Sequence, residues 1–263
     1  MSDLLVSARD QVLRLTLNRP EALGALTPDL RDDLIARLSE ASADPEVRAV
    51  ILTGTGRGFC TGADLRTDSG SVSGERIPGD VARTIRLGAQ RLIAAVLDCE
   101  KPVLAAVNGT AAGLGAHLAF ACDLVLAAES ARFIEVFVRR GLVPDAGGAY
   151  LLPRLLGPHR AKELMFFGDA LPAPDAERLG LVNRVVPDAE LGKTADTWAA
   201  RLAAGPTRAL ALTKHLVNTS LDADRATAFA AEAWAQEINM TTEDAREGLR
   251  AFTERRGPQF RGR

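Results

Sequence analysis

The chain has 263 residues, which is long enough for one large domain or for one domain with an appendage. Its content of 47% hydrophobic and 25% charged residues is typical of an ordinary globular protein and excludes a disordered, fibrous or membrane-embedded chain. The net charge of −2 excludes the overall basic field that concentrates nucleic acids or anionic lipids, so we expect no nucleic acid and no membrane as partner.

The cysteines and histidines are few, with three of each. The cysteines show no Cys-x-x-Cys spacing, which argues against a disulfide framework and against a metal site. The first residues lead into a strand-like run without the basic and then apolar segments of a signal peptide. We therefore expect a cytoplasmic location.

The chain opens with two strand-like runs, at residues 4–8 and 12–17, which predict a hairpin. Thr27 followed by Pro28 offers an N-cap with proline at the first helical position, and a helix is expected from there to Asp44. Apolar residues fall on one face of that helix at helical spacing: Leu30, Leu34, Ile35, Leu38 and Ala41.

Continuous apolar runs follow at residues 49–52, 103–107 and 123–127, and they predict strands buried on both faces. Between the first two runs, the polar and glycine-rich residues 67–80 predict a mobile loop, and residues 81–97 predict a helix. Because strand, loop and helix alternate repeatedly, the sequence predicts an α/β fold with a largely parallel component.

From about Pro206 onward the pattern is helical only, most clearly at residues 209–218 and 225–240. This part of the chain is interpreted as a helical appendage used for assembly. We therefore divide the chain into a core over residues 1–205 and a C-terminal helical oligomerisation region over residues 206–263.

Three glycine-bearing segments lie at wide intervals, at residues 57–65, 108–115 and 141–148. A nucleotide cofactor is a weak explanation, because neither of the first two segments has the glycine spacing of a dinucleotide-binding turn. In these two segments a glycine stands before Ala63 and before Leu114, where it would let the backbone turn an N–H group toward a ligand oxygen. A tight turn explains either segment alone, but the pair indicates an oxyanion hole.

Several further motifs occur in order along the chain: Leu17-Asn18-Arg19-Pro20, residues 22–26 and 58–65, Lys101-Pro102, Val107-Asn108-Gly109, residues 144–148, Gly180-Leu181-Val182 and residues 252–256. Together they resemble the crotonase, or enoyl-CoA hydratase/isomerase, superfamily nearly from end to end. The resemblance implies a crotonase-like spiral of ββα units with a C-terminal helical trimerisation region, and a homotrimer or a dimer of trimers. It also implies an acyl-CoA thioester as substrate and no resident cofactor, because coenzyme A enters as part of the substrate.

By motif position, the resemblance assigns the oxyanion donors to the backbone N–H groups of Ala63 and Leu114, which would stabilise a thioester enolate. It places coenzyme A and the substrate at Ala22, Leu23, Ala25, Ala63, Asp64, Leu65, Arg66, Phe137, Phe252 and Arg255. Arg255 would reach the coenzyme A of a neighbouring subunit, with a solvated helix end as the alternative. The loop at residues 67–80 is expected to line the acyl pocket. Gly24 departs from the family pattern, because many members have asparagine there.

The acid–base positions depart from those of the family's hydratases, which use two glutamates. The matching positions hold His117 and Phe137, and Glu135 does not match the register of the family glutamate. Asp145 stands where several isomerases and dehalogenases of the family place a working aspartate. With Phe137, it resembles the ring-epoxide acyl-CoA isomerase branch of phenylacetate breakdown. A single carboxylate suffices for isomerisation, because it can remove a proton from one carbon and return it to another.

We therefore expect an acyl-CoA isomerase with Asp145 as the acid and base, and an apolar wall that raises the pKa of Asp145. Asp145 could instead cap a helix that begins at Ala146. His117 either relays a proton or is buried against a backbone carbonyl, while Asp64 stabilises its turn and Asp123 caps or pairs locally. The alternative functions are an enoyl-CoA hydratase that uses Asp145 and His117, and a catalytically silent acyl-CoA-binding protein.

Overall fold

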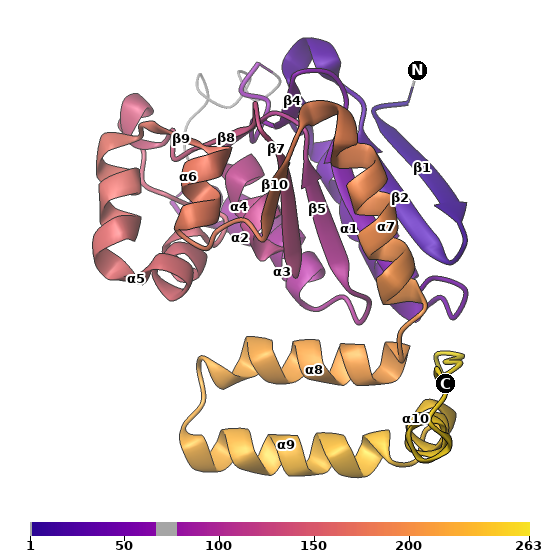
Figure 1. Ribbon diagram of the computed structural model, residues 1–263. Coiled ribbons are helices and arrows are strands. Elements are labelled where there is room, and N and C mark those ends of the chain that lie inside the picture. Colours follow the sequence, from indigo (N-terminus) through magenta and orange to yellow (C-terminus); the bar gives the residue numbers. More distant parts are fainter. Residues whose placement is uncertain (1, 67–77) are drawn as a thin grey trace.

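The computed structural model describes residues 2–66 and 78–263, and it contains two β-sheets (Figure 1). The expected loop at residues 67–80 lies almost entirely outside the described residues. The larger sheet has the order β1-β2-β3-β5-β7-β10. Its strands are β1 (Leu4–Arg9), β2 (Val12–Leu17), β3 (Ala49–Gly54), β5 (Val103–Val107), β7 (Leu124–Ala128) and β10 (Arg184–Val186). The smaller sheet consists of β4 (Gly58–Cys60), β6 (Thr110–Ala112), β8 (Arg132–Ile134) and β9 (Ala170–Pro172).

The predicted hairpin and first helix are confirmed. β1 and β2 pair antiparallel, and the turn between them places Asp10 and Gln11 at φ angles of 50° and 64°, in the left-handed conformation that suits a two-residue hairpin turn. Helix α1 (Pro28–Ala43) begins where expected, because the Thr27 side chain accepts a hydrogen bond from the Leu30 N–H at 3.2 Å. All the apolar positions predicted for its inner face are buried.

Three successive ββα units form most of the molecule, and each unit gives one strand to each sheet before its helices. The first is β3–β4 with α2 (Asp80–Leu87) and α3 (Ala89–Leu97), the second is β5–β6 with α4 (Leu114–Ala121), and the third is β7–β8 with α5 (Gly148–Phe167). From β2 to β10 the neighbouring strands of the larger sheet are parallel. The α/β fold with a parallel component is therefore confirmed.

The helical segment expected over residues 81–97 is confirmed, except that it breaks at Gly88 into two helices. This residue has φ −108° and ψ −95°, and it separates α2 from α3. A side chain there would lie 2.5 Å from the Arg31 guanidinium nitrogen Nη1 of α1. The break thus accompanies a close approach between helices that are distant in the sequence.

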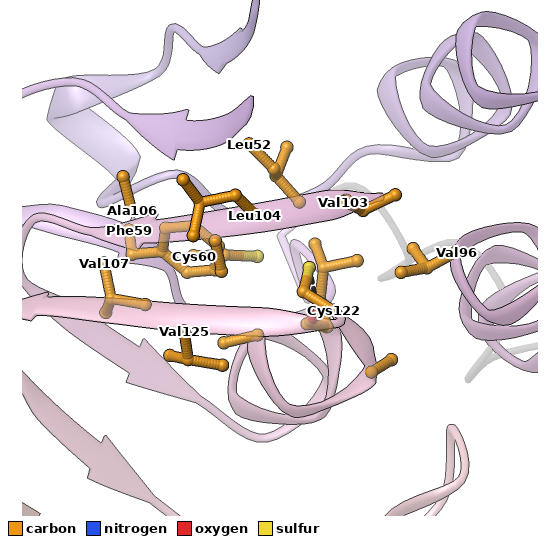
Figure 2. Packing of buried hydrophobic residues seen from close by; sticks show 14 of the residues in the cluster. Leu52, Phe59, Cys60, Val96, Val103, Leu104, Ala106, Val107, Cys122 and Val125 are labelled. Carbon is orange, nitrogen blue, oxygen red and sulfur yellow. Dashed lines mark hydrogen bonds between the residues drawn. The ribbon is translucent and has the colours of Figure 1, made fainter. Parts of the chain in front are cut away.

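The hydrophobic core lies between the two sheets and beneath α7 (Leu191–Ala203), which packs across β2, β3, β5 and β7. Figure 2 shows Phe59 and Cys60 of β4 in the same cluster as Leu104 of β5 and Val125 of β7. The three cysteines are buried and free, and burial raises the pKa of the Cys60 thiol to about 12.

The C-terminal part of the chain contains α8 (Thr207–Ser220), α9 (Arg225–Asn239) and α10 (Glu243–Glu254). In Figure 1, α8 and α9 run side by side below the core. Lys214 of α8 joins the two parts, because its Nζ lies 2.8 Å from the Asp123 carboxylate. The expectation that Asp123 pairs locally is therefore wrong. Among the described residues, no helix is long and apolar enough to cross a bilayer.

Candidate active site

The two predicted oxyanion segments lie side by side because β4 and β6 pair in parallel. Cys60 lies opposite Ala111, so the residues that follow the two strands, which include Ala63 and Leu114, leave the sheet at the same edge. A side chain built at Gly62 would lie 3.5 Å from the backbone nitrogen of Leu114. The strand pairing thus brings together two N–H groups that are far apart in the sequence.

Both N–H groups remain available for a ligand. The residues on either side of Ala63 bond to Leu26: the Leu26 N–H donates to the Gly62 carbonyl at 2.8 Å, and the Asp64 N–H donates to the Leu26 carbonyl at 2.9 Å. This parallel bridge uses no N–H of Ala63 itself. Leu114 is the first residue of α4, so its N–H has no acceptor within the helix. Neither N–H donates a hydrogen bond within residues 2–66 and 78–263.

The glycine before each donor has a backbone conformation that disfavours other residues. Gly62 has φ 88° and Gly113 has φ 53°, both in the left-handed region. A side chain at Gly113 would also lie 3.3 Å from Val136 and 3.5 Å from the Phe137 ring. The glycines of the first two motifs therefore turn the chain where a larger residue would be strained.

A cleft of about 420 Å³ opens at these two segments. It brings together most of the site residues predicted from the sequence: Ala22, Leu23, Ala25, Ala63, Asp64, Leu65, Arg66, Leu114, Phe137 and Asp145. Glu21 and Arg140 also line it. The geometry therefore gathers these residues at one place, and their roles stay predictions.

Three of the predicted site residues do not line this cleft. Phe252 and Arg255 lie at the end of α10, where the Phe252 side chain is 85% exposed and Arg255 is exposed as well. The third is His117, which is completely buried.

Asp145 lies in a turn before α5 rather than at the cap of that helix. Ala146 and Gly147 have φ angles of 47° and 78°, and α5 begins only at Gly148 with Gly147 as its N-cap. The Asp145 side chain makes no hydrogen bond to any residue that the structure describes, so the capping alternative is wrong. Burial raises the pKa of Asp145, nearby His117 opposes this rise, and the Glu135 carboxylate adds to it.

His117 is paired with Glu135, a residue that does not match the register of the family's glutamates. Its Nε2 lies 3.0 Å and 3.1 Å from the two Glu135 carboxylate oxygens. The imidazole stacks on the Phe137 ring, with centroids 5.5 Å apart and planes 12° apart. The expected backbone carbonyl partner is therefore wrong. The two residues are 18 apart in the sequence, and the only sequence signal for their pairing is that each is flanked by apolar residues.

Asp64 stabilises its turn, as expected. Its carboxylate accepts hydrogen bonds from the Arg66 backbone N–H at 3.1 Å and from the Arg66 guanidinium at 3.0 Å. The Arg19 guanidinium lies 3.0 Å from the same carboxylate. The Arg66 side chain, with Arg19 behind it, holds the pKa of Asp64 well below its usual range. A carboxylate this firmly ionised is a poor proton carrier.

The chain is similar to several known proteins over its full length. The enoyl-CoA hydratase/isomerase family pattern matches residues 7–263. A "Probable enoyl-CoA hydratase" of Rhodobacter capsulatus is 42% identical, with 95% of this chain and 94% of that protein aligned. The 1,2-epoxyphenylacetyl-CoA isomerase of Escherichia coli is 38% identical over the whole of both chains.

A solved structure has the same fold throughout. It is the enoyl-CoA hydratase/isomerase of Cupriavidus metallidurans, with a TM-score of 0.93, 37% identity, and 100% of this chain and 97% of the other covered. The agreement extends from the paired strands to the C-terminal helices, since the whole of this chain is covered. The chain therefore belongs to the enoyl-CoA hydratase/isomerase family.

Proposed function

We propose that the protein is an acyl-CoA isomerase that shifts a double bond, or rearranges a ring, through a thioester enolate. The observation that carries the proposal is that Asp145 lines the same cleft as the Ala63 and Leu114 N–H groups and has no hydrogen-bond partner among the described residues. The other carboxylates that line the cleft are Glu21, which is exposed, and Asp64, which two arginines hold ionised. Asp145 is thus the best placed to exchange a proton.

The reaction on a 3-enoyl-CoA then needs one proton carrier and two fixed donors. The Asp145 carboxylate takes a proton from C2, and the electron pair of that C–H bond moves onto the thioester oxygen to form a dienolate. The Ala63 and Leu114 N–H groups donate to this oxygen, and each well-placed donor contributes about 3 kcal/mol in a site sheltered from water. Asp145 returns the proton to C4 while the double bond settles between C2 and C3, so the carboxylate is regenerated.

The surroundings of Asp145 suit this cycle. Phe137 lines the cleft and is 8% exposed, and burial raises the pKa of Asp145. A carboxyl group whose pKa moves toward neutrality is a better base than an ordinary aspartate while still returning its proton readily. The 1,2-epoxyphenylacetyl-CoA isomerase of Escherichia coli supports the ring-rearranging form of the proposal by its name.

Hydration of an enoyl-CoA is the second candidate, because the Rhodobacter capsulatus relative carries a hydratase name. In that reaction Asp145 would activate water and a second group would have to protonate carbon. His117 was the expected partner, but it is fully buried and paired with Glu135, so it does not reach the cleft. The geometry therefore favours isomerisation.

The proposal includes the assembly and the location of the protein. Large apolar side chains of α8–α10, such as Trp234 and Phe252, are exposed at 70% and 85%. This exposure supports a homotrimer or a dimer of trimers in which these helices meet other copies. Phe252 and Arg255 would then contact the coenzyme A bound to a neighbouring copy. We place the reaction in the cytoplasm, with coenzyme A arriving in the substrate and no resident cofactor.

The test is the Asp145→Asn variant, assayed on 3-enoyl-CoA esters of several chain lengths. We expect kcat to fall by roughly 10³-fold while KM changes little, because the amide keeps the shape of the side chain but accepts no proton. Asp169→Asn is the matched control, since the Asp169 side chain is 85% exposed and lies outside the cleft. Wild-type activity in Asp145→Asn would overturn the assignment.

Two further measurements separate the alternatives. A strong hydration rate on crotonyl-CoA that disappears in His117→Ala would favour the hydratase. Tight binding of acyl-CoA esters without turnover of any ester in the panel would favour the silent binding protein.

A further inference from the structure

Behind the cleft lies a buried pair of titratable side chains that the proposed reaction does not use. The His117 side chain is 0% exposed and that of Glu135 is 4% exposed, and Nε2 of the histidine lies within 3.1 Å of both carboxylate oxygens. The Phe137 ring lies against the imidazole and also lines the cleft. The pair is thus one aromatic ring away from the substrate site.

The His117 ring supports the turn that carries Asp145. A side chain built at Gly148 would lie 2.2 Å from Cε1 and 2.3 Å from Nε2 of the ring, so the backbone of α5 sits directly on the imidazole. The Gly148 N–H donates to the Asp145 carbonyl at 3.0 Å. The intervening Ala146 is fully buried. A shift of the ring would therefore move the turn and the Asp145 carboxylate with it.

The backbone of His117 is also connected to the segment that carries the proposed oxyanion donor Leu114. His117 lies one helical turn after Leu114 in α4, and its N–H donates to the Gly113 carbonyl at 3.1 Å. The Gly113 N–H in turn donates to the Ile134 carbonyl at 2.9 Å, next to Glu135 in the chain. Three separate segments, which carry Leu114, Phe137 and Asp145, therefore meet at His117.

The environment of the second ring nitrogen of His117 indicates that this residue has a role beyond packing. Nδ1 is buried and has no hydrogen-bond partner among the described residues. An unpaired buried polar atom costs about 1–3 kcal/mol, so this ring is not the most stable way to fill the space. The Glu135 carboxylate accepts a hydrogen bond from Nε2 and so fixes the ring orientation, as carboxylates do for functional histidines in other proteins.

We propose that His117 and Glu135 form a positioning dyad for Asp145, which fixes the place of its carboxylate relative to the Leu114 N–H and sets how readily it accepts a proton. The existence of the dyad does not depend on the proposed isomerase function. Only its purpose, the positioning of Asp145 for proton transfer, rests on that function. Neither side chain touches the substrate, and the dyad acts through the Asp145 turn and through its charge.

Glu135 and His117 have opposite effects on the pKa of Asp145. The Glu135 carboxylate disfavours a second negative charge nearby and raises the pKa of Asp145, whereas His117 lowers it. The other charged residues that line the cleft are Glu21, Asp64, Arg66 and Arg140, and the variants below leave all of them in place. Changes in the dyad should therefore move the titration of Asp145 in a direction that depends on which member is altered.

The test compares the Glu135→Gln and His117→Gln variants. In each variant the new glutamine side chain can still hydrogen-bond to the unchanged member of the dyad. The midpoint of Asp145 is measured by pH-difference infrared spectroscopy of the full chain, and Asp145→Asn identifies its carboxyl band. We expect Glu135→Gln to lower the midpoint and His117→Gln to raise it. The acid limb of kcat/KM should move in the same directions, because Asp145 must be ionised to act as the base.

A purely structural role predicts a different result, in which both variants lose activity and neither moves the midpoint. That result would overturn the proposal. Asp123→Asn is the matched control, because it breaks the ion pair between Asp123 and Lys214, neither of which lines the cleft; it should lower Tm and leave the Asp145 midpoint unchanged. If the wild-type protein shows no isomerase activity, the proposed function fails, while the spectroscopic titration still decides the dyad.

Discussion

The ββα core and the C-terminal helices differ in where their apolar side chains lie. In α4, which begins at the donor Leu114, all 8 residues are buried. In α9, only Ala235 of 15 residues is buried, and Trp234 beside it is 70% exposed. α4 thus completes its packing within one chain, whereas α9 leaves large apolar side chains exposed, and such side chains are available for contacts with another molecule.

The largest effect is expected from Gly115→Ala, which attacks the packing of the core. A side chain at Gly115 would lie 1.9 Å from the Cys60 carbonyl oxygen, so α4 would have to move away from β4. We expect a loss of about 3 kcal/mol in the free energy of unfolding, measured by urea denaturation, and a loss of turnover as the two oxyanion donors separate. Gly192→Ala, with nothing within 4 Å, is the control and should be nearly neutral. Equal stability of the two variants would contradict the close packing of α4 against β4.

The next effect concerns the junction between the two regions. Lys214→Met leaves the Asp123 carboxylate without its cation, and that side chain is only 21% exposed. We expect a loss of about 2 kcal/mol in urea denaturation, with kcat for the isomerase reaction changed less than twofold. Arg208→Met breaks an exposed pair with Glu100 and should cost less than about 0.5 kcal/mol. A large fall in kcat for Lys214→Met would show that the cleft depends on the junction.

A smaller effect on folding, but a clear one on assembly, is expected from Trp234→Ser in α9. The side chain is largely exposed, so the stability of one chain should change by less than about 0.5 kcal/mol. Association measured by sedimentation velocity should weaken by roughly tenfold or more, because large exposed aromatic residues dominate interfaces. The exposed residue Glu237, changed to Ala, serves as the control. A wild-type protein that is monomeric in the same measurement would contradict the expectation that the exposed apolar side chains of α9 form an interface.

The smallest effect is expected from Asp145→Asn on stability rather than on activity. The pKa of Asp145 is raised in the folded protein, so folding favours its protonated form, and that contribution is lost as the pH rises through the folded pKa. The amide removes this cost, and Tm at pH 7 should rise by about 2 °C, with no rise below about pH 4, where the wild-type carboxyl is protonated as well. A lower Tm at pH 7 would show that the ionised carboxylate is stabilised by its surroundings.

Local patterns predicted much of the fold. The cap at Thr27, the buried face of α1 and the apolar runs that became β3, β5 and β7 follow from side-chain chemistry within a few residues. The glycines at positions 62 and 113 marked the donor segments, since their backbone conformations are costly for any other residue.

The features that local patterns did not predict depend on contacts between segments that are distant in the sequence. Gly88 breaks a helical pattern next to Arg31, and the Lys214 partner of Asp123 lies 91 residues away. The start of α5 was placed too early because Ala146, a good helix former, is held at φ 47° by its buried position in the turn. The Glu135 partner of His117 depends likewise on the pairing of β6 with β8, which no local pattern reveals.

The parallel register of the smaller sheet has a consequence for how this family can change over evolutionary time. Ala63 follows β4, Leu114 follows β6 and Val136 follows β8, and all three residues line the cleft. In the proposed mechanism the working group of Ala63 and of Leu114 is a peptide N–H, which every residue but proline supplies. If the proposed oxyanion donors are correct, substitution of the Ala63 or Leu114 side chain leaves the enolate-stabilising groups in place, and a change of acid–base groups elsewhere in the cleft alters the reaction without altering the intermediate.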